Sequence, residues 1–187
     1  MDLSSSTQTT QYLTFRLDGE TFAIEISRVR EVLDFTVITK VPGTPDFVRG
    51  VINLRGNVVP VVDMRLKFGM TETEKTVNTC VIIVEIALDG ETAVLGALAD
   101  SVQEVIDFGP GQVEPAPKIG MRLNTEFIKG LGKRTGPGGD RFIIILDIDK
   151  VFSGTELAMV EEAGAVSAAI SGTQPQMGQD GDAQATI

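Results

Sequence analysis

Residues 47–68 read FVRGVINLRGNVVPVVDMRLKF, and the rest of the chain is best interpreted outward from this stretch. Two runs rich in β-branched residues, 51–54 and 58–64, flank Arg55-Gly56-Asn57. Gly and Asn tolerate positive φ, so the pattern predicts a β-hairpin with its turn at this tripeptide. The second run is almost continuously apolar, which is typical of a strand buried on both faces, and Pro60 predicts an edge or a bulge within it.

Arg55 stands out in this hairpin because it is a permanent cation at the tip of an otherwise apolar unit. An exposed turn arginine is the ordinary interpretation, since charged side chains are rarely buried. A role in binding is the alternative, and the turn residues alone leave both interpretations open.

The plan of the first half of the chain recurs in the second half. Three pairs of segments match: residues 17–21 with 88–92, both LDGET, 47–50 with 127–130, and 59–64 with 143–148. The offset between the copies grows from 71 to 84 residues, so they differ by insertions, chiefly at 109–124 and 133–140. The sequence therefore predicts an internal duplication of a β-rich unit.

Local patterns within each unit predict short strands and one small helix. Strands are expected at 12–17, 21–26, 37–41 and 77–86, with Asp18-Gly19 as a two-residue hairpin turn. Short strands joined by tight turns favour an all-β fold of two small barrels, because closure removes exposed strand edges.

Two short amphipathic helices are expected at matching places in the two units. After Ser27, the residues Val29, Val32 and Leu33 have the i, i+3, i+4 spacing of a helix of about two turns. In the second unit, residues 101–104 have the form of a capping box, and Val102, Val105 and Ile106 repeat the spacing.

The remaining segments lie outside the duplicated core. Residues 1–11 are rich in Ser, Thr and Gln, which predicts disorder. A capping box at Ser153-x-x-Glu156 predicts a C-terminal helix over 153–163, and residues 164–187 are expected to form a disordered acidic tail. The domain between them spans 12–152, with a first barrel over 12–76 and a second over 77–152, between which strands can be exchanged.

Composition argues against most catalytic chemistry. The 187 residues contain no histidine, which removes the commonest general base and metal ligand. The single cysteine, Cys80, lies in an apolar strand-like run and is expected to be a buried, inert thiol. Asp147 and Asp149 are two residues apart, but a solvated strand end explains them better than a metal or acid–base pair. We therefore expect no enzyme, no metal and no cofactor.

Charge and hydropathy narrow the possible partners and compartment. The net charge is −10, and five of the 26 acidic residues follow Lys150, after which there is no Lys or Arg. Such a balance argues against a nucleic-acid surface, which also needs clustered aromatic residues among basic ones. No run of eighteen apolar residues and no basic leader occurs, so neither membrane insertion nor a signal peptide is expected, and a cytoplasmic location fits.

These motifs together resemble the CheW family of bacterial chemotaxis coupling proteins. The resemblance is carried by FVRGVINLRG at 47–56 and VPVVDMR at 59–65, and it extends through residues 29–32, 100–102, 115–117, 127–132 and 146–147. It covers about residues 12–152, and the insertion at 133–140 and the acidic tail depart from it. By this resemblance the fold is two five-stranded β-barrels with a hydrophobic groove between them.

The resemblance also implies a function and a site. The protein would couple the cytoplasmic tips of methyl-accepting chemoreceptors to the regulatory domain of the histidine kinase CheA, at the inner-membrane receptor array, without catalysis. Its receptor-binding residues would be Ile26, Val29, Glu31, Gly50, Arg55, Val102 and Val105, with Arg55 and Glu31 as an ion pair at the rim of a groove for a receptor helix. The kinase-binding residues are not assigned.

Alternatives remain for the residues and for the function. Val29, Val102 and Val105 can equally be core residues, and Gly50 can be needed for backbone geometry alone. A CheW-like domain of a pathway for pili or gene regulation fits the same motifs. A CheV-type adaptor or the kinase itself would need further domains that do not fit in 187 residues. A β-barrel that binds a small ligand or an oligonucleotide belongs to another class, and the acidic charge opposes it.

Overall fold

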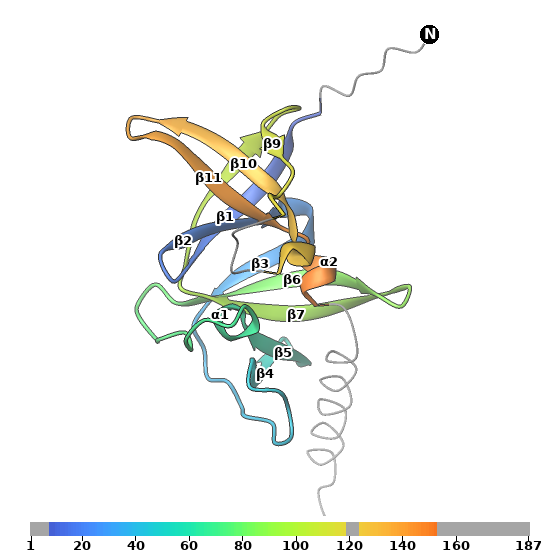
Figure 1. Ribbon diagram of the computed structural model, residues 1–187. Coiled ribbons are helices and arrows are strands. Elements are labelled where there is room, and N and C mark those ends of the chain that lie inside the picture. Colours follow the sequence, from blue (N-terminus) through green and yellow to red (C-terminus); the bar gives the residue numbers. More distant parts are fainter. Residues whose placement is uncertain (1–7, 119–123, 153–187) are drawn as a thin grey trace, which may run out of the picture.

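The computed structural model describes residues 8–118 and 124–152, which form a β protein of two mixed sheets (Figure 1). The predictions for residues 1–7, for a helix over 153–163 and for a tail over 164–187 lie outside these ranges, while strand β1 begins at Thr10, inside the segment predicted as disordered. The elements are, in order, β1 (Thr10–Leu17), β2 (Glu20–Glu25), η1 (Ile26–Arg28), β3 (Val29–Asp34), β4 (Val48–Leu54), β5 (Asn57–Asp63), α1 (Met64–Lys67), β6 (Cys80–Leu88), β7 (Glu91–Ala99), β8 (Ser101–Phe108), β9 (Val113–Glu114), η2 (Thr125–Phe127), β10 (Ile128–Gly136), β11 (Gly139–Leu146) and α2 (Ile148–Val151).

The two sheets have the same internal order, which confirms the predicted all-β, duplicated fold. The five-stranded sheet is ordered β3-β6-β7-β5-β4, and the six-stranded sheet is ordered β8-β1-β2-β11-β10-β9. The β1–β2 hairpin corresponds to β6–β7, so each sheet combines a hairpin from one half of the chain with strands from the other. Within the described residues neither ladder closes on itself, so two open sheets, one with an additional strand, replace the closed five-stranded barrels.

Tight turns fix the hairpins as the sequence predicted. Asp18-Gly19 and Asp89-Gly90 have the same backbone angles, with φ of 50° at each Asp and 83° at each Gly. The central hairpin turns at Arg55-Gly56, with φ of 51° and 85°, and Asn57 already belongs to β5. Positive φ at both central residues is the type I′ geometry that suits the twist of paired strands.

The two predicted amphipathic helices are wrong. The residues after Ser27 form one 3-10 turn and then strand β3, and the expected capping box lies in strand β8. Each of these strands carries a bulge, in β3 between Val29 and Glu31 and in β8 opposite the step from Leu13 to Phe15. An extra residue breaks the two-residue alternation of a strand, and the apolar positions then imitate helical spacing.

Two smaller expectations concern the strands around the central hairpin. Residues 37–41 do not form a strand, and only an isolated bridge joins Thr39 to Val51 in β4. The parallel ladder between β5 and β7 covers Val61 to Asp63, so Pro60 lies just outside it. Pro60 therefore costs no hydrogen bond to β7, although β5 itself lies inside the sheet, between β7 and β4, and is not an edge strand.

The largest core lies between the two sheets, and each sheet also curls around a core of its own. The main core joins buried residues of both hairpins, such as Phe15, Phe22 and Ile82, and Phe22 stacks on Phe68 with ring centroids 5.9 Å apart. Cys80 is buried in this core, as predicted, and its burial raises the pKa of the thiol. Apolar burial of this extent is the main force that holds the sheets together.

Candidate functional site

Arg55 and Glu31 form a bidentate ion pair at the edge of the five-stranded sheet, which confirms the predicted pairing of these two residues. The Arg55 Nη1 and Nη2 atoms donate to the Glu31 Oε1 and Oε2 atoms at 2.6 and 2.9 Å. The β4–β5 turn that carries Arg55 is held by Asn53, whose Oδ1 atom accepts from the Gly56 N–H at 2.8 Å. Two parallel bonds are the strongest arrangement between a guanidinium and a carboxylate.

This ion pair joins the two strands at opposite ends of the sheet order, β3 and the β4–β5 turn. Leu33 of β3 and Leu54 of β4 pack on the same buried cluster, so the sheet curls and the ion pair spans its seam. The Arg55 hydrogen bonds lower the pKa of Glu31, and Glu31 raises the pKa of Arg55. The Arg55 side chain is 72% exposed and that of Glu31 only 25%, so the guanidinium is the part that a partner can reach.

Gly50 lies in β4, beside the segment around Thr39 that connects β3 to β4. The Thr39 and Val51 backbones exchange two hydrogen bonds, of 2.9 and 2.8 Å. Gly50 has φ of 140°, and a Cβ atom there would lie 2.0 Å from the Thr39 carbonyl oxygen. Only glycine fits this conformation and this contact, so backbone geometry alone is a sufficient reason for Gly50.

The apolar residues predicted for the site lie in different surroundings. Ile26, Val29 and Val102 are partly buried and pack on the main core, so the core interpretation applies to both of these valines. Val105 is 48% exposed on β8, in the other sheet from Arg55. The structure thus brings Glu31 and Arg55 into direct contact, while a continuous apolar groove through the other residues stays a prediction.

A counterpart of this ion pair occurs in the six-stranded sheet and was missed from the sequence. Glu104 of β8 and Arg134 of β10 form an ion pair, and Glu104 raises the pKa of Arg134. Glu104 has the position in β8 that Glu31 has in β3, because residues 29–32 (VREV) and 102–105 (VQEV) match in the repeat. The repeat therefore held the signal for Glu104, although it does not indicate the arginine.

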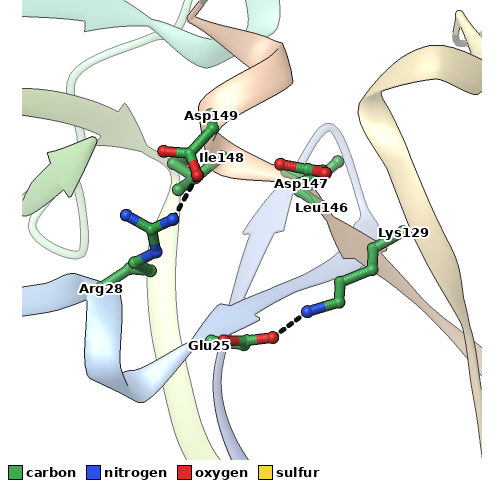
Figure 2. Close-up of a pocket in the computed structure, with 7 residues that line it drawn as sticks. All are labelled: Glu25, Arg28, Lys129, Leu146, Asp147, Ile148 and Asp149. Carbon is green, nitrogen blue, oxygen red and sulfur yellow. Dashed lines mark hydrogen bonds and ion pairs between the residues drawn. The ribbon is translucent and has the colours of Figure 1, made fainter. Parts of the chain in front are cut away.

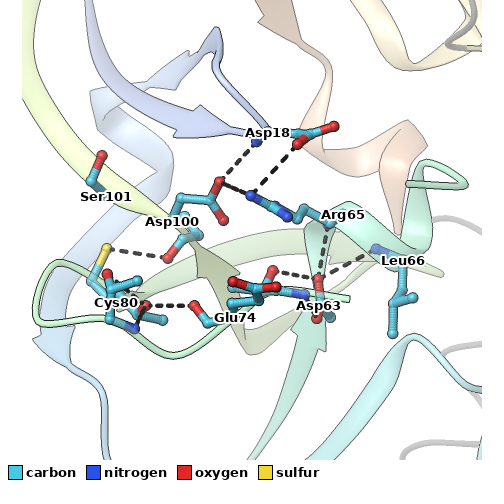
Figure 3. Close-up of polar contacts among 12 residues, drawn as sticks. Asp18, Asp63, Arg65, Leu66, Glu74, Cys80, Asp100 and Ser101 are labelled. Carbon is cyan, nitrogen blue, oxygen red and sulfur yellow. Dashed lines mark hydrogen bonds and ion pairs between the residues drawn. The ribbon is translucent and has the colours of Figure 1, made fainter. Parts of the chain in front are cut away.

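Buried carboxylates fix the junction between the sheets on one side of the molecule (Figure 3). Asp63 is fully buried at the end of β5, where its Oδ1 atom accepts from the Arg65 N–H at 3.0 Å. The same carboxylate accepts from the Thr73 N–H at 2.9 Å and from the Thr73 hydroxyl at 2.8 Å. Asp63 therefore begins α1 and anchors the loop that follows it.

Arg65 extends this junction to the six-stranded sheet (Figure 3). Its Nε and Nη2 atoms donate to one Asp100 oxygen, Oδ2, at 3.1 and 2.6 Å, and the hydrogen bonding raises the pKa of Arg65. The same oxygen accepts from the Asp18 N–H at 2.8 Å, in the turn of the β1–β2 hairpin. Apart from Asp100 Oδ1, which is buried without a hydrogen-bond partner, these groups bond to one another, which is the pattern of a structural network.

The opposite junction surrounds a small polar pocket of about 140 Å³ (Figure 2). Arg28 pairs with Asp149, and Lys129 pairs with Glu25, across it. Asp149 also accepts from a backbone N–H of β6, and Asp147 caps α2 by accepting from the Lys150 N–H at 3.3 Å. Both aspartates thus follow β11 as expected, but Asp147 caps α2 and Asp149 lies within it, so structural partners replace the expected solvation.

The described residues also limit the kind of site that this protein can have. Within residues 8–118 and 124–152, no group of three or more His, Cys, Asp or Glu side chains is arranged to hold a metal ion. No helix in the same ranges is both long and apolar enough to cross a membrane. The prominent polar groups are ion pairs that hold strands and sheets together, so fold and site define a duplicated two-sheet scaffold.

Comparison with known proteins places this scaffold in a family. The model of the CheW-like domain matches residues 11–156, and the chain belongs to that family. It is 36% identical to a chemotaxis protein CheW of Klebsiella aerogenes, over 85% of this chain and 91% of that protein. It is 32% identical to that of Rhizobium meliloti, over 78% and 89%. A crystal structure of the CheW scaffolding protein of Thermoanaerobacter tengcongensis superposes with a TM-score of 0.68 at 32% identity, over 83% and 96% of the two chains.

Proposed function

We propose that this chain is a non-catalytic chemotaxis adaptor that couples methyl-accepting chemoreceptors to the regulatory domain of the histidine kinase CheA. Membership of the CheW-like family and similarity to chemotaxis and scaffolding proteins support this function. The adaptor works in the cytoplasm, at receptors of the inner membrane. We assign it recognition without catalysis, in line with the scaffolding protein that it resembles.

The observation that carries the receptor site is the exposed Arg55 guanidinium fixed by Glu31. An arginine held in place by a carboxylate loses little conformational entropy when it meets a partner, so its remaining N–H groups are ready to donate. The backbone conformation at Gly50, with φ of 140°, belongs to β4 of the same hairpin. We assign the receptor helix to this edge, with Ile26 and Val29 of the neighbouring η1–β3 segment as apolar contacts and with Val102 and Val105 extending the surface across the second sheet.

The test is a pull-down of purified chain with a receptor cytoplasmic fragment and, separately, with the CheA regulatory domain. Arg55→Ala is expected to reduce receptor binding by about tenfold, the effect of removing one well-placed charged anchor, and to leave kinase binding unchanged. Arg134→Ala is the matched control, since it breaks the equivalent ion pair of the other sheet. Unchanged receptor binding by Arg55→Ala would remove the site and leave the function.

Exchanging the two charges distinguishes direct contact of Arg55 with the receptor from a purely structural role of the ion pair. Glu31→Arg combined with Arg55→Glu restores the ion pair in reverse, so it rescues binding if the pair acts only by holding β3 to the hairpin. Continued loss of receptor binding by the exchanged pair is the expected result for a guanidinium that contacts the receptor. If the wild-type chain binds neither fragment, from whichever chemosensory pathway they are taken, the adaptor function itself is wrong.

A further inference from the structure

The β10–β11 hairpin is longer and more basic than its counterpart in the other sheet. Its ladder continues for two more pairs, Thr135 with Asp140 and Gly136 with Gly139, where the β4–β5 ladder ends at Leu54 with Asn57. Residues 128–146 contain four Lys or Arg and one Asp in a chain whose net charge is −10. The hairpin extends away from the body of the molecule (Figure 1). It coincides with the insertion at 133–140, and none of the residues assigned to receptor binding lies in it.

A cavity of about 460 Å³ opens between this hairpin and the β1–β2 hairpin. Three guanidinium groups line it, from Arg16, Arg134 and Arg141, against two carboxylates, Glu20 and Glu104. Glu104 is neutralised by Arg134, whereas neither Arg16 nor Arg141 makes an ion pair with any residue that the structure describes. Two guanidinium groups thus line one cavity without a carboxylate partner, and an anionic ligand there would supply the missing counter-charge.

Apolar side chains beside these charges extend the surface. The Phe142 ring lines the same cavity and is 51% exposed, which is unusual for a residue of this size on a strand. A second cavity, of about 470 Å³, shares Glu104 and Arg134 with the first. It follows the seam between the edges of β8 and β10, and Val105 and Lys133 line it. The Glu104–Arg134 ion pair thus stands between two adjoining hollows that together form an elongated site.

We propose that this elongated site binds a short acidic peptide segment of a partner protein, in extended conformation. Arg16 and Arg141 would take its carboxylates, Phe142 and Val105 would pack on its apolar side chains, and the seam would hold its backbone. The elongated shape favours a peptide over a compact anion, and the free guanidinium groups favour carboxylates because they can bind them in bidentate fashion. This surface lies on the six-stranded sheet, away from the Glu31–Arg55 edge, and it shares only Val105 with the proposed receptor surface.

The test uses the whole chain alone, so it does not depend on the proposed coupling function. A fluorescein-labelled peptide with the sequence EFEEVE is titrated in low salt, and binding is followed by fluorescence anisotropy. Arg16→Gln with Arg141→Gln is expected to weaken binding by tenfold or more, on the order expected for the loss of two charge-assisted contacts. Phe142→Ala is expected to weaken it several-fold. Lys40→Gln with Lys75→Gln, which removes the same charge from two loops that connect strands of the five-stranded sheet, is the control and is expected to change the affinity by less than about twofold, the scale of screened distant charges.

Several outcomes would overturn the proposal. Equal weakening by the control variant would show attraction to overall charge and no site. Displacement of the peptide by free glutarate, or by a single-stranded DNA of equal charge at equal concentration, would show a general anion surface. If Arg16→Gln with Arg141→Gln unfolds, as its melting curve would reveal, Arg16→Lys with Arg141→Lys replaces it. That variant keeps the charge, so an unchanged affinity there would reject bidentate recognition.

Discussion

Asp63 and Asp147 have matching positions in the two sheets, and yet their surroundings differ. Asp63 is the last residue of β5 and Asp147 directly follows β11, and their N–H groups donate to the Phe47 and Phe127 carbonyls at 2.7 and 2.9 Å. Both also cap a one-turn helix. The Asp63 side chain is fully buried with Thr73 against it, whereas that of Asp147 is 29% exposed. The duplicated backbone has therefore kept its hydrogen bonds while burial of the same side chain has diverged.

The ion pairs next to these residues have kept their place and exchanged their charges. Two residues after Asp63 the cation Arg65 pairs with Asp100, and two residues after Asp147 the anion Asp149 pairs with Arg28. In both cases the carboxylate also accepts from a backbone N–H of the opposite β-hairpin. The comparison shows that the fold requires a linked pair at each junction and leaves the polarity of the pair free.

The largest expected effect comes from breaking the comparison at the aspartates. Asp63→Ala should cost about 3–5 kcal/mol of unfolding free energy, because it leaves the Thr73 and helix N–H groups without an acceptor in a buried place. Asp147→Ala should cost only about 1 kcal/mol, the usual value of an exposed helix cap. Urea unfolding of both variants measures the difference. Equal losses would mean that burial of Asp63 contributes nothing beyond its capping role.

A second comparison concerns the glycines at the matching bulges, Gly50 and Gly130. Gly50→Ala places a Cβ atom 2.0 Å from a backbone oxygen at φ of 140°, and we expect a loss of about 3 kcal/mol from strain and overpacking. At Gly130 the nearest atom is a side-chain carbon of Val113, at 2.6 Å, followed by the Glu114 carbonyl oxygen at 2.9 Å. Gly130→Ala should therefore cost about half as much, because a side chain can yield where a backbone cannot.

Melting temperatures of the two glycine variants would test this order. A matched variant, Gly19→Ala, has positive φ but open space around the added carbon, so it isolates the cost of conformation. If Gly50→Ala lowers the melting temperature no more than Gly19→Ala does, the contact with Thr39 does not restrain β4. The segment around Thr39, between β3 and β4, is then free to move.

The elements that the sequence predicted correctly are those specified by a few adjacent residues. Asp18-Gly19 and Arg55-Gly56 each specify a turn through their own backbone preferences, independently of distant residues. The apolar runs beside these turns are stable only as strands. Val29 and Val102 were assigned to helices because a bulged strand and a short helix share the same apolar spacing. The strand conformation is favoured over the helix because β3 pairs with β6 and β8 pairs with β1, and such pairing depends on the whole sheet.

Only the part of the candidate site that belongs to a recognisable sequence motif could be predicted. Arg55 and its partner Glu31 belong to the segments that resemble the CheW family, and the bidentate pair follows from their types. Arg134 could not be paired with Glu104 from the sequence, because that contact depends on how the edges of β8 and β10 approach each other. The burial of Asp63 was equally hidden, since the loop that carries Thr73 has no regular pattern.

The smallest expected effect is the pH dependence of the Glu31–Arg55 pair. Hydrogen bonds from Arg55 lower the pKa of Glu31 below its ordinary value of 4.5, so folding favours the ionised form. The stabilisation by Glu31 is then fully present above pH 4.5 and is lost as the pH falls through the lowered pKa. The melting-temperature difference between wild type and Glu31→Gln should therefore be constant from neutral pH to about 5 and shrink in more acidic solution.

The pair is exposed on its arginine side, so the difference should be a few degrees at most. Repeating the pH series in an Arg55→Ala background is the control, because without that guanidinium only the weaker attraction of Arg30 still lowers the pKa of Glu31, and most of the acid-dependent difference should vanish. If the melting-temperature difference between wild type and Glu31→Gln changes between pH 8 and pH 6, another ionisable group must be responsible. The stability of the five-stranded sheet at this edge would then not depend on the ionisation of Glu31.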